Sequence, residues 1–165
     1  MNQYGMPFEI YTVAFFGHRY VDRLLDAEDK LERVLHQLLE EKSYVDFLVG
    51  RDGDFDQAVS STICRLKRNF RDDNSAHIWV LPYPTAEYLE NQKCYEEYYD
   101  EIEICGEAAK AHFKAAYQIR NRYMVDRADL IICYIEHESG GAYQTIKYAE
   151  KQGKKIINLA DDTEE

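Results

Sequence analysis

Three short loops combine glycine with cationic or hydroxyl side chains, a combination suited to binding phosphate. They are Gly17-His18-Arg19, Gly50-Arg51-Asp52-Gly53 and Ser139-Gly140-Gly141. Glycine lets the backbone approach a ligand, a helix N-terminus presents unpaired N–H groups to an anion, and arginine adds charge-assisted donors. Each loop precedes a predicted helix, so together they indicate a phosphate cradle. The alternative is that these glycines only make tight turns.

A fourth basic element, Arg120-Asn121-Arg122, lies near the end of a predicted helix. Residues two apart on a helix diverge by about 200°, so one arginine is expected to face the site and the other to face solvent. The alternative is that both cations only favour the helix C-terminus. The chain has neither a Walker A pattern nor a GxGxxG fingerprint, so the usual ATP and NAD clamps are not supported.

Catalysis on a nucleotide would require a carboxylate, and the candidates are Asp100, Glu101 and Glu136. Acids in a surface run are usually solvated, which weakens the first two. The catalytic residues therefore stay unknown, and we do not expect an enzyme. We also expect no metal and no cofactor, since the spacing of Cys94, Cys105 and His112 matches no recognised ligand pattern.

The elements that must position these residues alternate along the chain. Apolar and β-branched runs predict strands over 10–16, 44–49, 77–81, 130–135 and 155–159, and apolar spacings of three and four predict helices over 22–41, 54–71, 108–126 and 140–152. This order predicts an α/β fold, a Rossmann-like three-layer sandwich of about five parallel strands with helices on both faces. Ligands of such sheets bind at the carboxyl ends of the strands, where the glycine loops lie.

The charge of the chain is unevenly distributed. We expect residues 1–165 to form a single domain with an acidic, tyrosine-rich excursion over about 83–107 and a short acidic tail over 160–165. The net charge is −11, and these two acidic segments carry it, so the remainder is neutral overall. Non-specific nucleic-acid binding needs a cationic surface, so we expect no nucleic-acid polymer as partner. A small ligand held by local amides and arginines stays compatible with this charge.

Composition also predicts a cytoplasmic protein without a membrane partner. No apolar run approaches the roughly 20 residues that cross a bilayer, and the N-terminus lacks a basic region followed by an apolar stretch. The four cysteines contain no CxxC pair, which is typical of reduced thiols.

Several of these segments also resemble a known family. The runs VAFFGHR, LVGRDGDFDQAV, LPYP, YYDEI and RNRYMVDRADLIICYIEHESGGAYQTIKYAEKQGKKIINL resemble the SLOG superfamily, the Rossmann-like fold shared by the LOG cytokinin-activating enzymes and the DNA-processing protein DprA. Within it, the chain is most similar to small stand-alone bacterial or phage proteins related to YpsA. The similarity spans Thr12 to Leu159.

The resemblance implies binding loops for nucleotides or nucleotide-derived ligands. By motif, it assigns ligand-binding positions to Gly17, His18, Arg19, Gly50, Gly53, Asp56, Arg120, Asn121, Gly140, Gly141 and Thr145. LOG enzymes carry a PGGxGTxxE pattern whose glutamate acts in catalysis, and here Lys147 takes that position. LOG-type cleavage of an N-glycosidic bond is therefore not expected.

The expected function is binding of a small phosphate-bearing nucleotide, such as an ADP-ribose-like ligand or a cyclic nucleotide, by a sensor or sequestering module. His18, Arg19, Arg51 and Arg120 would hold its phosphates. Two alternatives stay open: a LOG-type N-glycosidase or nucleotide hydrolase, and a non-catalytic oligomeric scaffold. A homo-oligomer is expected, and the scaffold would use exposed tyrosines of the excursion as its interface, namely Tyr88, Tyr95, Tyr98 and Tyr99.

Overall fold

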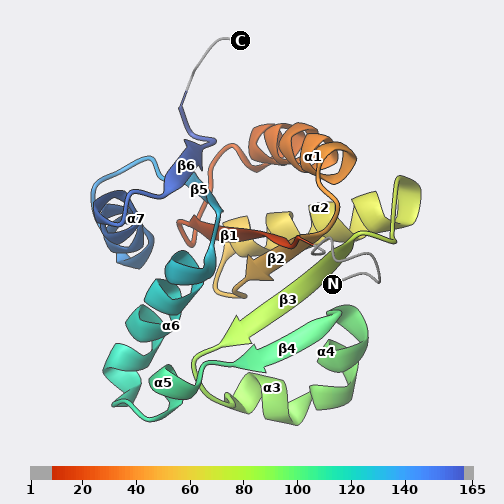
Figure 1. Cartoon of the computed structure of the whole chain (residues 1–165). Helices are drawn as coiled ribbons and strands as arrows, with labels where there is room; N and C mark the ends of the chain where they lie inside the picture. The colour runs from red at the N-terminus through yellow and green to blue at the C-terminus, as the bar shows by residue number, and fades with distance from the viewer. Residues whose placement is uncertain (1–8, 162–165) are drawn as a thin grey trace.

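A parallel β-sheet runs through the middle of the molecule (Figure 1). The computed structural model describes residues 9–161, so most of the expected acidic tail lies outside the described residues. The sheet has six strands in the order β4-β3-β2-β1-β5-β6, all paired in parallel. In chain order they are β1 (Tyr11–Gly17), β2 (Val45–Val49), β3 (Ser75–Leu81), β4 (Glu101–Ile104), β5 (Leu130–Tyr134) and β6 (Lys155–Asn158).

Helices cover both faces of this sheet. One face packs against α1 (Leu24–Glu41) and α2 (Asp54–Asn69), and the other packs against α6 (Phe113–Arg127) and α7 (Gly141–Lys151). Three shorter helices, α3 (Ala86–Glu90), α4 (Gln92–Tyr98) and α5 (Gly106–Ala109), lie around β4 (Figure 1). No helix within residues 9–161 has both the length and the apolar character that crossing a membrane requires.

The two cores follow from the alternation of side chains along each strand. In β1, Val13 and Phe15 are buried toward α1 and α2, whereas Ala14 and Phe16 are buried toward α6 and α7. Because both faces are covered, β1 and β5 are apolar almost throughout, as is usual for central strands of parallel sheets. The predicted Rossmann-like sandwich with helices on both faces is therefore confirmed.

The structure adds one strand to the five that the sequence predicts. Within the acidic excursion, Glu101–Ile104 pairs with β3 as the edge strand β4. It is only four residues long and half-exposed, and its acids alternate with isoleucines. The rest of the excursion helps to hold β4 beside β3, because Tyr99, just before β4, is buried against Trp79 of β3.

The strand order reverses between β1 and β5. From β1 the chain proceeds outward through β2 and β3 to β4, whereas β5 continues to β6 on the opposite side. Successive crossovers therefore leave this pair in opposite directions, and a crevice opens beyond its carboxyl ends. The predicted glycine loops after β1 and before α7 flank that crevice.

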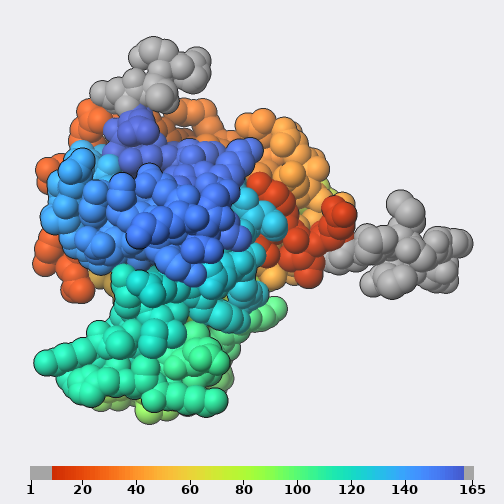
Figure 2. Space-filling view, turned by 60° about the vertical axis from the view of Figure 1, so that its left-hand side comes forward, coloured from red at the N-terminus to blue at the C-terminus, as the bar shows by residue number. Residues whose placement is uncertain are grey.

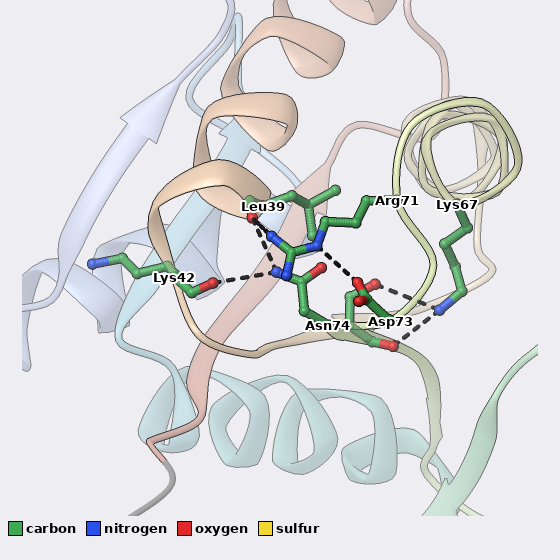
Figure 3. Close-up of polar contacts among 7 residues, drawn as sticks. Leu39, Lys42, Lys67, Arg71, Asp73 and Asn74 are labelled. Atoms are coloured by element: carbon green, nitrogen blue, oxygen red, sulfur yellow. Dashed lines mark hydrogen bonds and ion pairs between the residues drawn. The ribbon is translucent and has the colours of Figure 1, made fainter.

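The amino edge of the sheet is fastened by side chains near the end of α1 (Figure 3). Asn74 donates to the carbonyls of Leu39 and Lys42 at 2.9 and 3.2 Å, and Arg71 also donates to Leu39 at 3.2 Å. Lys67 on α2 donates to the carbonyl of Ser75 at 2.9 Å. The carbonyls of Leu39 and Lys42 lie at the end of α1, where a helix leaves them without helical partners, and that of Ser75 begins β3, so these donors tie α1, α2 and β3 together.

At the carboxyl edge, the loops after β1 and β2 touch through their backbones. The amide of Asp54 donates to the carbonyl of Arg19 at 2.7 Å, and the Asp54 carboxylate accepts from the amide of Val21 at 3.0 Å. A Cβ on Gly53 would lie 2.5 Å from the Cα of Arg19. Only glycine permits this approach, since the neighbouring atoms are backbone.

We therefore expect Gly53→Ala to lower the free energy of unfolding by about 1–3 kcal/mol, the usual cost of overpacking. Gly106→Ala is the matched control, because a Cβ at Gly106 meets no atom within 4 Å. Urea denaturation of both variants measures the difference. A Gly53→Ala variant as stable as the control would contradict the close packing of the two loops.

Candidate functional site

A cavity of about 670 Å³ lies at the carboxyl edge, where the strand order reverses. We refer to it as the cleft. Its volume falls within the roughly 300–1,000 Å³ typical of ligand sites. Ten of the twelve predicted ligand-binding residues line it: Gly17, His18, Arg19, Gly50, Gly53, Asp56, Arg120, Asn121, Gly140 and Gly141. The other two, Arg51 and Thr145, do not line the cleft.

The first turn of α7 forms one wall of the cleft. Gly140 has a φ of 95°, a conformation that favours glycine, and it gives α7 no side-chain cap. A Cβ added to Gly140 or Gly141 would meet no atom within 4 Å. Packing therefore does not require glycine at position 141. The absence of a side chain there leaves the N-terminus of α7 open to an anion.

The opposite rim carries an exposed cation and exposed aromatic rings. The side chain of Arg19 is exposed, and the backbone of Arg19 lies in close contact with Gly53. Tyr20 beside it is 77% exposed, and Tyr117 of α6 is 38% exposed, and both line the cleft. An exposed arginine and two accessible rings on one cleft suit a ligand that has both phosphate and flat rings.

His18 connects loops that border the cleft and does not serve there as a cation. Its Nε2 accepts hydrogen bonds from the amides of Glu136 and His137 at 2.9 and 3.3 Å, so this nitrogen carries no proton. The His137 ring stacks on it at a centroid distance of 3.7 Å. Burial, together with the neighbouring His137, lowers the pKa of His18 and favours the neutral form. His18 thus joins the loop after β1 to the loop after β5.

Arg120 is likewise engaged inside the protein. It is 3% exposed, and its guanidinium donates to the carbonyl of Val80 at 2.9 Å and to the Asp52 carboxylate at 2.9 Å. Its Nε donates to Asn121 at 3.1 Å. The charge is thus largely neutralised by Asp52, and Arg120 offers the cleft little free positive charge.

Asn121 continues this network to α7. Its amide group donates to Thr145 Oγ1 at 3.1 Å, and that hydroxyl donates to the carbonyl of Gly141 at 3.0 Å. Thr145 is fully buried, which explains why it does not line the cleft. Its contact instead sets the position of the open first turn of α7 relative to α6.

Asp56 is a carboxylate that lines both the cleft and an adjoining cavity. Its Oδ2 accepts from the amide of Asp52 at 2.8 Å. Burial and the nearby Asp52 charge raise the pKa of Asp56 to about 7, against the opposing effect of Arg120. Asp56 is therefore partly protonated near neutral pH.

The carboxylates suggested for catalysis lie elsewhere. Glu101 is exposed at the amino end of β4, and Glu136 is exposed after β5, where its carboxylate accepts from Tyr134 at 3.4 Å. Lys147 is exposed on α7 and pairs with Glu150 at 3.2 Å. Within the described part of the chain, no three His, Cys, Asp or Glu residues are grouped so as to hold a metal ion.

Arg51 turns away from the cleft toward two adjoining cavities of about 470 and 200 Å³. Its guanidinium bonds Glu87 and the Tyr99 hydroxyl, each at 3.2 Å. The larger cavity shares Gly50 and Asp56 with the cleft, and the smaller shares Asp52, Tyr117 and Arg120 with it. Both smaller cavities therefore adjoin the cleft.

Sequence reasoning missed several residues of the cleft. Tyr20 follows the Gly17-His18-Arg19 loop directly, so its position was a usable signal. Asp52 lies inside the second glycine loop, and His137 lies between β5 and the last glycine loop. Tyr117 gave no such signal, because only the packing of α6 brings it to the cleft.

No protein-family model matches the chain, and no curated protein matches it either. Solved structures do. DNA processing protein A (DprA) from Streptococcus pneumoniae superimposes with a TM-score of 0.63 at 17% identity, over 89% of this chain and 49% of that one. DprA from Helicobacter pylori, described for its single-stranded DNA binding mode, gives 0.59 at 17% identity, over 88% and 63%. The chain thus spans about half to two thirds of these proteins.

These neighbours overturn the functional expectations drawn from the sequence. The Helicobacter pylori protein binds single-stranded DNA, so the predicted small-nucleotide sensor or sequestering module, with an ADP-ribose-like or cyclic ligand, is wrong. The alternatives of an N-glycosidase or an oligomeric scaffold do not fit either, and the homo-oligomer has no support. The exclusion of nucleic-acid polymers is also wrong. It rested on net charge, which sums over the whole chain and does not describe the local surface.

The likeness covers 88–89% of this chain. At this identity it concerns the fold. The chain has the Rossmann-like fold of these DprA structures.

Proposed function

We propose that this chain binds single-stranded DNA along the carboxyl edge of its sheet. The observation that carries the proposal is a cleft of about 670 Å³ that shares lining residues with two further cavities, of about 470 and 200 Å³. Adjoining cavities suit neighbouring nucleotides of one strand better than one compact ligand. The single-stranded DNA bound by the Helicobacter pylori DprA supports the same class of partner.

In this proposal the cleft holds a phosphate of the strand. Arg19 supplies an exposed cation, and the open first turn of α7 supplies amides at its positive end. Tyr20 and Tyr117 offer rings on which neighbouring bases stack, a contact that every base can make. Binding would therefore depend little on sequence.

The acidic chain is compatible with this partner if few phosphates are neutralised. Of the two arginines that line the cleft, Arg120 is paired with Asp52. The affinity would come chiefly from amides, one arginine and stacking, in place of a broad cationic surface. This predicts an unusually weak dependence on salt.

Two finer assignments belong to the same proposal. The motifs between Thr12 and Leu159 support membership of the small stand-alone bacterial group related to YpsA. The four cysteines are all free thiols, which supports a cytoplasmic location.

The first test is the salt dependence of binding to a fluorescent oligothymidine strand. Each neutralised phosphate contributes about −0.7 to the slope of log K against log salt concentration. We expect a slope of roughly −1 for the unmodified protein, and Arg19→Ala should flatten it by about 0.7. Arg68→Ala is the control, because Arg68 is exposed near the far end of α2. Absence of binding by the unmodified protein would refute the proposal.

The second test blocks the helix N-terminus. Gly141→Val should weaken strand binding roughly tenfold, because its side chain occupies the space before the amides of α7. The thermal midpoint should stay close to that of the parent, since no atom lies within 4 Å of the new Cβ. Unchanged affinity in the folded variant would show that α7 does not hold the phosphate.

The third test uses pH. Protonation of Asp56, whose pKa burial raises to about 7, removes a negative charge from the cleft. Strand affinity should therefore be higher near pH 6 than near pH 8, by roughly fivefold. Asp56→Asn should remove most of this difference and bind near pH 8 as the parent does near pH 6. His137→Gln, which leaves Asp56 in place, should keep the pH dependence; if it loses it, Asp56 is not the group responsible.

A further inference from the structure

The 470 Å³ cavity beside the cleft is a slot between two helices of different character. We call it the aromatic slot. One wall comes from α2 and the other from α4, within the acidic excursion. It adjoins the cleft, because Gly50 and Asp56 belong to the walls of both.

The α2 wall is small and polar. Gln57, Ser60 and Ser61 lie on one face of α2, at spacings of three and four residues. Ser60 is buried and bonds the His77 ring at 2.9 Å, whereas Gln57 and Ser61 are exposed. A helix face that packs against its neighbour is normally apolar, so these residues leave the slot open and line it with hydrogen-bonding groups.

The α4 wall is aromatic and firmly supported. Tyr98 is 43% exposed, and its ring stands at 89° to that of Tyr99, with centroids 4.8 Å apart. Tyr99 is buried against His77 and Trp79 at 4.7 and 5.1 Å. Tyr98 is thus an accessible ring on a rigid aromatic base, which lowers the entropy lost when another ring stacks on it.

Arg51 closes the end of the slot. Its guanidinium lies 4.8 Å from the Tyr95 ring and donates to the Tyr99 hydroxyl at 3.2 Å. Burial raises the pKa of Tyr98 and of Tyr99, so both hydroxyls stay protonated at neutral pH. The slot therefore joins a ring surface to neutral donors and acceptors, with a cation at one end.

We infer that the aromatic slot receives one unpaired nucleobase of the strand whose phosphate lies in the cleft, an inference that rests on the proposed function. A base is flat enough to stack on Tyr98 while its edge meets Gln57 and Ser61 across the slot. A base in a duplex is already stacked and paired, so it cannot enter without being extruded. The slot thereby selects single strands over duplexes.

The test compares a single strand with the same strand carrying abasic positions throughout. Base stacking contributes about 1–3 kcal/mol, so Tyr98→Ala should weaken binding of the intact strand roughly tenfold. It should leave the affinity for the abasic strand unchanged, and Tyr98→Phe, which keeps the ring, should behave as the parent. Ser61→Phe, which fills the slot from the exposed face of α2, should reproduce the Tyr98→Ala result without altering α4.

The outcomes separate this inference from the proposed function. If Arg19→Ala weakens binding of both strands but Tyr98→Ala and Ser61→Phe change neither, the strand binds without using the slot and the inference fails. If the parent binds neither strand, the proposed function itself fails. Equal affinity of the parent for the intact strand and its duplex would also overturn the selection that we assign to the slot.

Discussion

The arrangement of the carboxyl edge depends on the buried guanidinium of Arg120. A charge removed from water must be paired and hydrogen-bonded, and this one bonds the end of β3 through Val80, the loop after β2 through Asp52, and its own neighbour Asn121. Those partners belong to three separate parts of the chain. The guanidinium therefore fixes where α6 lies over the sheet, and through Asn121 and Thr145 it also fixes the first turn of α7. The shape of the cleft therefore depends on the hydrogen bonds and the ion pair that one buried cation requires.

This arrangement changes how the charge of the chain is understood. In a sequence, an arginine beside a glycine loop indicates a group that binds phosphate. In the structure, however, Asp52 largely balances the charge of Arg120, and Glu87 pairs with Arg51. The cations that shape the site are mainly structural, and open backbone amides and rings are left to face the ligand. An acidic protein can in this way present a surface suited to a polyanion, since the sum over all residues hides the few groups that matter.

More of the architecture than of the site could be predicted from the sequence. Strands β1 and β5 are apolar runs with glycine or polar residues at their ends, so they could be identified as strands from the sequence. Ligands of parallel sheets bind at the carboxyl ends of the strands, and ten of the predicted residues do line one cleft there. Strand β4 was not predicted, although its acids and isoleucines alternate as in a half-buried strand, because it is only four residues long and lies within an acidic segment. Arg51 and Thr145 do not line the cleft, because tertiary partners, Tyr99 and Asn121, determine where their side chains point. The aromatic slot needs the packing of α4 against β3, which no local pattern encodes.

The fastening of the amino edge has a consequence for how such a protein can diversify. Asn74, Arg71 and Lys67 hold the ends of α1 and α2 to the start of β3 (Figure 3), at the edge of the sheet opposite the cleft. The segment from α3 to α5 leaves the sheet after β3 and pairs with it again only through the edge strand β4, and in the space-filling view the green and teal residues project from the body (Figure 2). Insertions, deletions or exchanged side chains in that projection would leave the anchoring contacts intact. Ligand preference could therefore drift between related chains while the framework that folds them stays the same.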